Sequence, residues 1–139
     1  MPTLFTRIIE GELPGRFVWR DETCVGFLSI APIATGHTLV VPIAEVDHWL
    51  DLDADVAAHL TVVAQTIGKA QMAAFSPTRI GLLVAGLEVP HCHVHVIPID
   101  SEADLRFDRA DASTPAEALD AAAERLRTAL RDQGAANWV

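Results

Sequence analysis

The sequence predicts a single α+β domain, in which about five antiparallel strands form a sheet beside a long helix and a C-terminal helix. Two patterns lead to this prediction. Short apolar, β-branched segments alternate with turn residues, as in strands joined by hairpins, and two other segments carry apolar residues at the three- and four-residue spacing of amphipathic helices. With 139 residues, of which 50% are hydrophobic, the chain is long enough for one core and too short for two.

Three strands are predicted in the N-terminal part of the chain, where β-branched and aromatic residues cluster between turns. They cover residues 17–20, 23–28 and 36–42. A short amphipathic segment with Phe5 and Ile8 precedes them and ends at Gly11. His37 stands at the beginning of the third strand, so it should lie near one end of the sheet.

The remaining elements are predicted from a change in apolar spacing. A long helix begins behind Asp53 as its N-cap and ends at Ser76. Two further apolar strands follow at residues 79–84 and 89–98, and a second helix covers about residues 115–133. Residues 101–113 are acidic and aperiodic and should form an exposed connection rather than a domain boundary, so residues 1–139 are expected to form one domain.

Charge and composition narrow the classes of function. The net charge is −9 and Lys69 is the only lysine, which argues against a nucleic-acid polymer as partner. A small phosphate ester can still be bound by imidazoles, backbone N–H groups and an arginine. The sequence contains neither a signal-peptide pattern nor an apolar run long enough to span a membrane, so we expect a cytoplasmic protein without membrane contact. Cys24 and Cys92 are expected to be reduced core residues.

Three of the six histidines, His91, His93 and His95, lie within five residues. In a strand they would share one face, because alternate side chains point the same way. Three interpretations follow from this pattern alone: hydrogen-bonded rings on a wet sheet face, a zinc site, or covalent catalysis. In the last, one neutral imidazole attacks phosphorus, a second fixes its tautomer and a third donates a proton. A pKa of about 6.5 suits histidine to this chemistry.

The segment His91-Cys92-His93-Val94-His95-Val96-Ile97-Pro98 resembles the His-φ-His-φ-His-φ-φ signature of the histidine triad (HIT) family of nucleotide-binding proteins and hydrolases, where φ is hydrophobic. Three other segments resemble the family's opening helix and turn, its upstream histidine strand and its approach to the triad. These are residues 8–14, 36–42 and 86–90. Together the matched segments span most of residues 4–98, the motif-bearing core.

The resemblance implies a HIT-like fold, commonly a homodimer, that acts on nucleoside phosphoramidates, dinucleoside polyphosphates or other nucleotidyl esters. It implies that His93 is the nucleophile and forms a nucleotidyl-imidazole intermediate, which water then hydrolyses. His95 corresponds to the residue on the phosphate and leaving-group side. His91 and His37 correspond to supporting histidines that orient the nucleophile or line the site. No cofactor is expected.

The chain departs from the family pattern where the nucleotide is recognised. Ser29 stands in place of an aspartate that contacts ribose, and Leu87 and Glu88 stand in place of two polar phosphate contacts. We therefore expect Ser29 and Glu88 to contact an altered substrate. Phe27 and Leu28, with Ile33 and Leu39, are candidates for the apolar slot of the base, although core packing is the commoner explanation for each. A nucleotide-binding module with little turnover is the alternative function.

No metal is expected. Family members with a structural zinc carry a Cys-x-x-Cys pair near the start of the chain, and the corresponding residues here are Thr3 and Thr6, which are not normal zinc ligands. His48 and His59 are expected to be surface or helix-boundary residues.

Overall fold

A computed structural model describes residues 1–139 as a five-stranded antiparallel sheet with the strand order β1-β2-β3-β5-β4. The strands are β1 (Phe17–Arg20), β2 (Cys24–Leu28), β3 (Thr38–Pro42), β4 (Arg79–Leu83) and β5 (Val94–Ile99). The helices are α1 (Leu4–Ile9), α2 (Ala54–Phe75) and α3 (Ala116–Asp132), with short 3-10 turns η1 (Trp49–Asp51), η2 (Glu102–Asp104) and η3 (Phe107–Arg109). This arrangement confirms the predicted α+β class.

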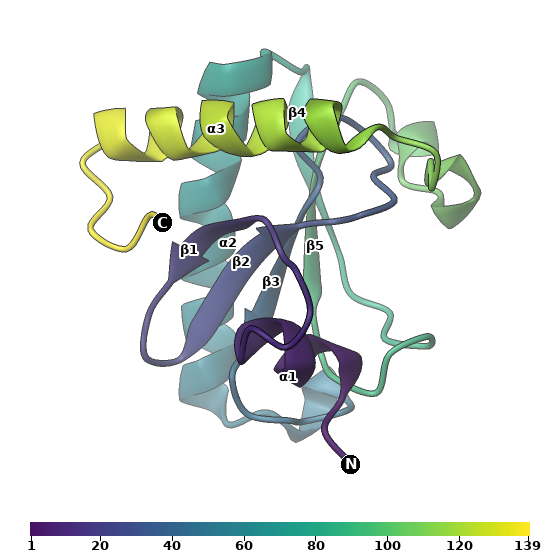
Figure 1. Cartoon of the computed structure of the whole chain (residues 1–139), viewed down its shortest axis with the longest axis vertical. Coiled ribbons are helices and arrows are strands. Elements are labelled where there is room, and N and C mark those ends of the chain that lie inside the picture. The colour runs from purple at the N-terminus through teal and green to yellow at the C-terminus, as the bar shows by residue number, and fades with distance from the viewer.

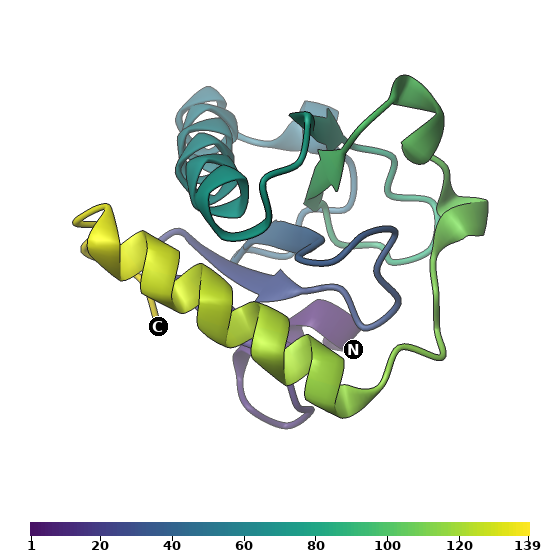
Figure 2. The same ribbon diagram turned by 90° about the horizontal axis from the view of Figure 1, so that it is seen from above.

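The sheet lies between α1 on one face and α2 on the other, as both views show, and α3 crosses α2 (Figures 1 and 2). Alternation along β2 separates two clusters of buried side chains. Cys24 and Leu28 belong to the larger core beneath α2 and α3, whereas Val25 and Phe27 belong to a smaller cluster with Phe5 of α1. The smaller cluster therefore defines a second face of the sheet, covered only by a short helix.

The order of the strands brings the histidine run next to the third strand. β5 lies between β3 and β4, and His95 stands opposite Leu39 in the β3–β5 register. Because directly paired residues share a face of a sheet, His95 lies on the same face as Leu39 and the α1 cluster. The β3–β5 pairing ends at Thr38 and Val96, immediately after His37.

Helix α2 forms because its buried residues follow helical spacing along one face. Leu60, Val63, Ile67 and Ala70 are all at most 1% exposed and pack on the sheet. The helix ends at Ser76, whose φ of 51° places it in the left-handed conformation. The predicted bounds of this helix are confirmed within one residue. None of the helices is long and apolar enough to cross a membrane.

The prediction of a strand over residues 89–98 is wrong in its first half, since β5 begins only at Val94. The preceding backbone bonds to loops instead of to a neighbouring strand. His91 donates its N–H to the Val89 carbonyl at 2.8 Å, and Cys92 donates to the Val46 carbonyl at 2.7 Å. His91 and His93 thus precede the sheet, and only His95 is a strand residue.

The two edges of the sheet differ. Along β1 the C-terminal tail runs antiparallel, with a bridge between Trp19 and Trp138, and the Asn137 carbonyl accepts from the Arg20 N–H at 2.9 Å. β4 is the last strand on the other side. One edge is therefore covered by the chain itself, and the other ends without a strand beside it.

Candidate active site

Four buried histidines meet on the face of the sheet that carries α1. His37, His91, His93 and His95 are between 0% and 8% exposed. The rings of His93 and His95 lie 4.9 Å apart between centroids, and those of His37 and His95 lie 5.2 Å apart. His91 does not continue this row as a strand would have required, because it lies before the sheet and bonds to other partners.

His93 is held in one tautomer by a backbone carbonyl. Its Nδ1 lies 2.8 Å from the carbonyl oxygen of His91, and a carbonyl can only accept, so Nδ1 carries the hydrogen. The lone pair of a neutral ring is then on Nε2. Burial lowers the pKa of His93 below its ordinary value, although the bond to the His91 carbonyl acts in the opposite direction. The ring is accordingly a neutral imidazole with a free Nε2 lone pair at neutral pH.

His37 donates a hydrogen bond to His95. The backbone N–H of Ile33 donates to His37 Nδ1 at 3.0 Å, so His37 carries its hydrogen on Nε2. That atom lies 2.9 Å from His95 Nδ1, which must accept, so the hydrogen of His95 is on Nε2. Burial, together with the neighbouring His95 and His93, lowers the pKa of His37 to about 3. Burial and His93 lower that of His95 to about 4. The site therefore presents a lone pair on His93 beside an N–H on His95.

His91 is hydrogen-bonded to the end of β3 and to the residue that caps α1. It is fully buried, its Nε2 lies 2.7 Å from the Pro42 carbonyl, and its Nδ1 lies 2.7 Å from the hydroxyl of Thr3. The ring thus donates to the end of β3 and accepts from the residue that caps α1. Thr3 also accepts from the Thr6 N–H at 3.1 Å. Thr3 and Thr6 both carry hydroxyl groups. They cannot supply the two thiolates of a structural zinc site that uses a Cys-x-x-Cys pair.

The residues predicted to bind substrate are not all brought together. Leu28 points to the opposite face of the sheet, into the core beneath α2 and α3. The prediction that Leu28 helps to hold a base is therefore wrong. Phe27 is on the histidine face but is 3% exposed and packs edge-on against Phe5, with centroids 5.6 Å apart. It lies behind Phe5, whose ring is 4.9 Å from that of His93.

The two polar candidates lie at the margin of the site. Ser29 follows β2, and its backbone N–H donates to the His37 carbonyl at 3.0 Å. Its hydroxyl accepts from the Ala31 N–H at 3.3 Å. Glu88 and Leu87 are exposed in the segment that leads to the histidines, and the negative charge of Glu88 acts to raise the pKa of His93 against the effect of burial. An anionic substrate would meet this charge unless Glu88 turned away.

Phe107 is a site residue that the sequence did not indicate. It belongs to η3, is 49% exposed, and its ring lies 5.2 Å from that of His95. The segment that carries it is an exposed connection, as predicted, in which only Asp104 and Leu105 are half-buried. Leu105 contacts β4, where a Cβ on Gly81 would come within 3.0 Å of its side chain. An isolated aromatic residue in a charged, aperiodic segment was the one available signal.

Another group of potential metal ligands lies between the β1–β2 hairpin and α2, where Asp21 and Cys24 of the hairpin approach His59 of the helix. Asp21 accepts from the Thr23 and Cys24 N–H groups and from the Trp19 indole, each at 2.8 Å, and from His59 at 2.7 Å. Burial raises the pKa of Asp21, but these hydrogen bonds outweigh it and lower the pKa to about 2. The carboxylate is a hydrogen-bonding centre for the hairpin. His59 lies near the start of α2 with its side chain 39% exposed, and it contributes one of these bonds.

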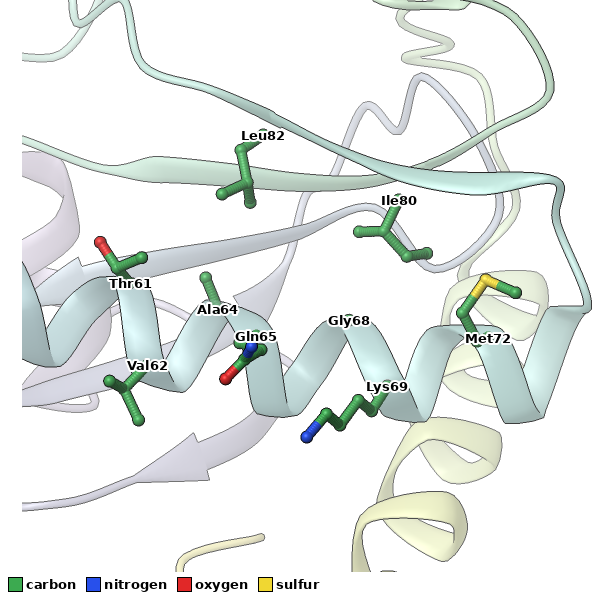
Figure 3. Close-up of a pocket in the computed structure, with 9 residues that line it drawn as sticks. All are labelled: Thr61, Val62, Ala64, Gln65, Gly68, Lys69, Met72, Ile80 and Leu82. Atoms are coloured by element: carbon green, nitrogen blue, oxygen red, sulfur yellow. The ribbon is translucent and has the colours of Figure 1, made fainter.

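An apolar groove lies on the opposite face of the sheet from His95, since Leu82 in its lining pairs with Val96. It encloses about 440 Å³ between α2 and β4, and nine residues line it (Figure 3). Val62, Met72 and Leu82 are between 41% and 59% exposed there. This groove runs along the strand at the uncovered edge of the sheet.

Comparisons with known proteins agree with this architecture. The model of the HIT domain matches residues 10–102. An uncharacterised HIT-like protein of Saccharolobus solfataricus is 34% identical over 104 residues, covering 71% of this chain and 75% of the relative. The crystal structure of a hypothetical histidine triad nucleotide-binding protein from Sulfolobus tokodaii superposes with a TM-score of 0.82 at 28% identity, covering 97% and 99% of the two chains. A Zn-bound histidine triad family protein from Mycobacterium smegmatis gives a TM-score of 0.82 at 25% identity, covering 96% of each chain.

Proposed function

The chain belongs to the HIT domain family of nucleotide-binding hydrolases and transferases, and we propose that it cleaves nucleotidyl esters or phosphoramidates through a covalent nucleotidyl-His93 intermediate. One observation carries this proposal. The hydrogen bonds leave a lone pair on His93 Nε2 and an N–H on His95 Nε2, in rings whose centroids are 4.9 Å apart. A nucleophile and a hydrogen-bond donor are the two groups that nucleotidyl transfer requires.

In the first half-reaction, His93 Nε2 attacks phosphorus and forms an N–P bond while the bond from phosphorus to the leaving group breaks. His95, which is neutral and carries its hydrogen on Nε2, donates a hydrogen bond from that N–H to the departing oxygen or nitrogen. The departing group takes its proton from solvent. The nucleotidyl-imidazole of His93 carries a positive charge, and its Nδ1–H still donates to the His91 carbonyl. That bond supports the charged intermediate.

In the second half-reaction, water or another acceptor attacks phosphorus and loses a proton to solvent, which replaces the proton that the leaving group took up. The N–P bond breaks, and its electrons return to His93 Nε2 as a lone pair. His37 keeps His95 in the required orientation, because its Nε2–H donates to His95 Nδ1. Each histidine ends the cycle in the protonation state of the substrate complex.

For substrate recognition we propose that the Ser29 hydroxyl contacts a ribose hydroxyl and that Glu88 lies at the rim of the phosphate site. Ser29 is half-buried beside the backbone of His37. A hydroxyl can bond a sugar hydroxyl singly, whereas a carboxylate can bond two at once. We expect weaker selection for ribose than an aspartate would provide.

The test is a panel of adenosine and guanosine phosphoramidates and dinucleoside polyphosphates assayed with the wild type and with His93→Ala. We expect His93→Ala to lower kcat/KM by at least about 1000-fold. Mass spectrometry of wild-type protein quenched during turnover should show the added mass of one nucleotidyl group, absent from the variant. His48→Ala, which removes an exposed histidine, is the matched control. Full turnover by His93→Ala would disprove the proposed nucleophile.

A second candidate function is nucleotide binding with little turnover. It is favoured by Leu87 and Glu88, which stand where the family pattern has polar phosphate contacts, because a phosphate without those contacts would be held less firmly for attack by His93. Calorimetry distinguishes the two. Tight binding of AMP or GMP together with negligible hydrolysis across the panel supports the binding module, and turnover of any member supports the enzyme.

We further propose that the protein is a homodimer formed across the groove between α2 and β4. The groove is apolar and follows a strand with no neighbour on its outer side. Exposed apolar surface at an unpaired edge is typical of an interface between protein chains.

A further inference from the structure

Gln71 is a polar side chain in the most buried part of α2. It is 0% exposed, and its amide nitrogen donates two hydrogen bonds, to the Gly36 carbonyl and to the Val96 carbonyl, each at 2.9 Å. A long apolar residue would fit the surrounding core and helical spacing better. The two bonds are therefore the distinctive feature of this position.

The two carbonyls that Gln71 binds are adjacent in sequence to two site histidines. Gly36 precedes His37, and Val96 follows His95. The pairing between β3 and β5 ends at Thr38 and Val96, so the backbone at His37 lies beyond the last pair of the ladder. One NH₂ group from α2 bridges the two backbones at the point where the sheet ceases to do so.

The orientation of the Gln71 amide follows from its partners. Both are carbonyl oxygens, so the NH₂ group must face them and Oε1 must point away. Oε1 is buried there without a hydrogen-bond partner. An unpaired buried acceptor costs free energy, so the residue is unfavourable for stability in one respect. Such a residue is expected where it serves an additional purpose.

We propose that Gln71 is a positioning residue that sets the distance between His37 and His95. By holding the backbones on both sides, it keeps His37 Nε2 at 2.9 Å from His95 Nδ1 and so keeps the hydrogen of His95 on Nε2. The consequence for turnover rests on the function proposed above, in which His95 Nε2 faces the leaving group. The consequence for the tautomer of His95 does not depend on turnover.

Gln71→Met tests the proposal, because methionine has a similar length but cannot donate. Both carbonyls lose the bond from Gln71, but the Gly36 carbonyl keeps its bond from the Thr38 hydroxyl at 2.8 Å and the unpaired Oε1 disappears, so stability should change little. We expect kcat to fall about 10-fold to 100-fold with KM nearly unchanged, since small displacements of catalytic groups act on the chemical step. Gln133→Met, at an exposed glutamine whose amide makes one 3.4 Å bond, is the matched control.

Two measurements separate positioning from a merely structural role. The ¹⁵N shifts of His95 should show one Nε2–H tautomer in the wild type and in Gln133→Met, and a mixture of tautomers in Gln71→Met. In a double-mutant cycle, Gln71→Met should add little to His37→Ala, because the two changes remove the same constraint.

An unchanged His95 tautomer in Gln71→Met, or a loss of kcat fully additive with that of His37→Ala, would overturn the proposal. If the wild type shows no turnover, the proposed function fails, and the tautomer comparison alone still decides the role of Gln71. If Gln71→Met does not fold, Gln71→Leu serves for the same measurements. Failure of both to fold would show a structural requirement and reject the proposal.

Discussion

The four site histidines are chemically unequal because each has a different hydrogen-bond partner. A carbonyl binds Nδ1 of His93, an imidazole binds Nδ1 of His95, and a backbone N–H binds Nδ1 of His37. The first ring is left with a lone pair on Nε2, whereas the other two are left with an N–H there. The hydrogen-bond partners of the rings therefore determine their different roles, because the rings themselves are identical.

Burial of these rings predicts a specific loss of stability in acid. In the unfolded chain they bind protons below about pH 6.5, but in the folded chain the pKa values of His95 and His37 are about 4 and about 3. Between these limits the unfolded state holds more protons, so the free energy of unfolding falls as the pH falls. Each ring contributes up to about 1.4 kcal/mol per pH unit.

Urea denaturation between pH 6.5 and pH 4.5 measures this slope, above the range in which carboxylates dominate. His37→Phe should have a smaller slope than the wild type, and His48→Phe, at an exposed site, should keep the wild-type slope. Equal slopes in wild type and His37→Phe would contradict the assigned burial.

The sequence could predict part of this site. Proximity in the chain brought His91, His93 and His95 together, but His37 comes from another strand and was assigned only through the family resemblance. Phe107 and Gln71 could not be found, because one lies in an aperiodic segment and the other occupies a position where helical spacing specifies an apolar residue. Leu28 was misassigned, since the face on which it lies depends on strand register.

At the level of elements, the β1–β2 hairpin is organised around one carboxylate. Asp21 bonds two backbone N–H groups of its own turn, the Trp19 indole on β1 and His59 on α2. The turn is thereby linked both to its strand and to the helix beneath the sheet. Asp21, which the sequence indicates only as a turn residue, thus also bonds a residue 38 positions further along the chain.

Asp21→Asn should destabilise the protein by about 1–3 kcal/mol, because the amide places an NH₂ group against donors and leaves buried groups unpaired. Thermal and urea unfolding measure the change. Glu22→Gln, at the exposed neighbouring residue, should change stability by less than about 0.5 kcal/mol. A variant Asp21→Asn as stable as wild type would rule out this role.

The elements themselves were largely predictable, since hydrophobic spacing is a local property. The strands and both long helices lie close to their predicted ranges. The error at residues 89–93 arose because the backbone there bonds to loops, although Val89 packs against the buried cluster around Phe5. Apolar spacing does not distinguish such an irregular buried segment from a strand. Cys92 illustrates this: it is 2% exposed, yet its N–H bonds to Val46 in a loop.

At the level of the whole molecule, the chemistry and the proposed interface lie on different parts of the sheet. The histidines lie on the face with α1, and the apolar groove lies between α2 and the edge strand β4. A change in the groove can therefore alter association without contacting the histidines.

Leu82→Lys places a charge in the groove and should convert a homodimer into a monomer, as measured by light scattering after size-exclusion chromatography. Leu82 is 50% exposed in the single chain, so the monomer should remain folded. Ile30→Lys, at an apolar residue that is 76% exposed outside the groove, should leave the dimer intact. A wild-type protein that is monomeric at micromolar concentration would disprove the proposed dimer.

The C-terminal tail along β1 limits how many copies can assemble through their sheets. A sheet with two open edges can add a copy on each side and grow into a fibre. Here one edge is occupied by residues 137–139 of the same chain, so only β4 can accept a neighbour. When two copies join β4 to β4, both open edges are used and growth stops at a closed pair. In the proposed homodimer, residues 137–139 thus occupy the one sheet edge that the dimer interface does not use.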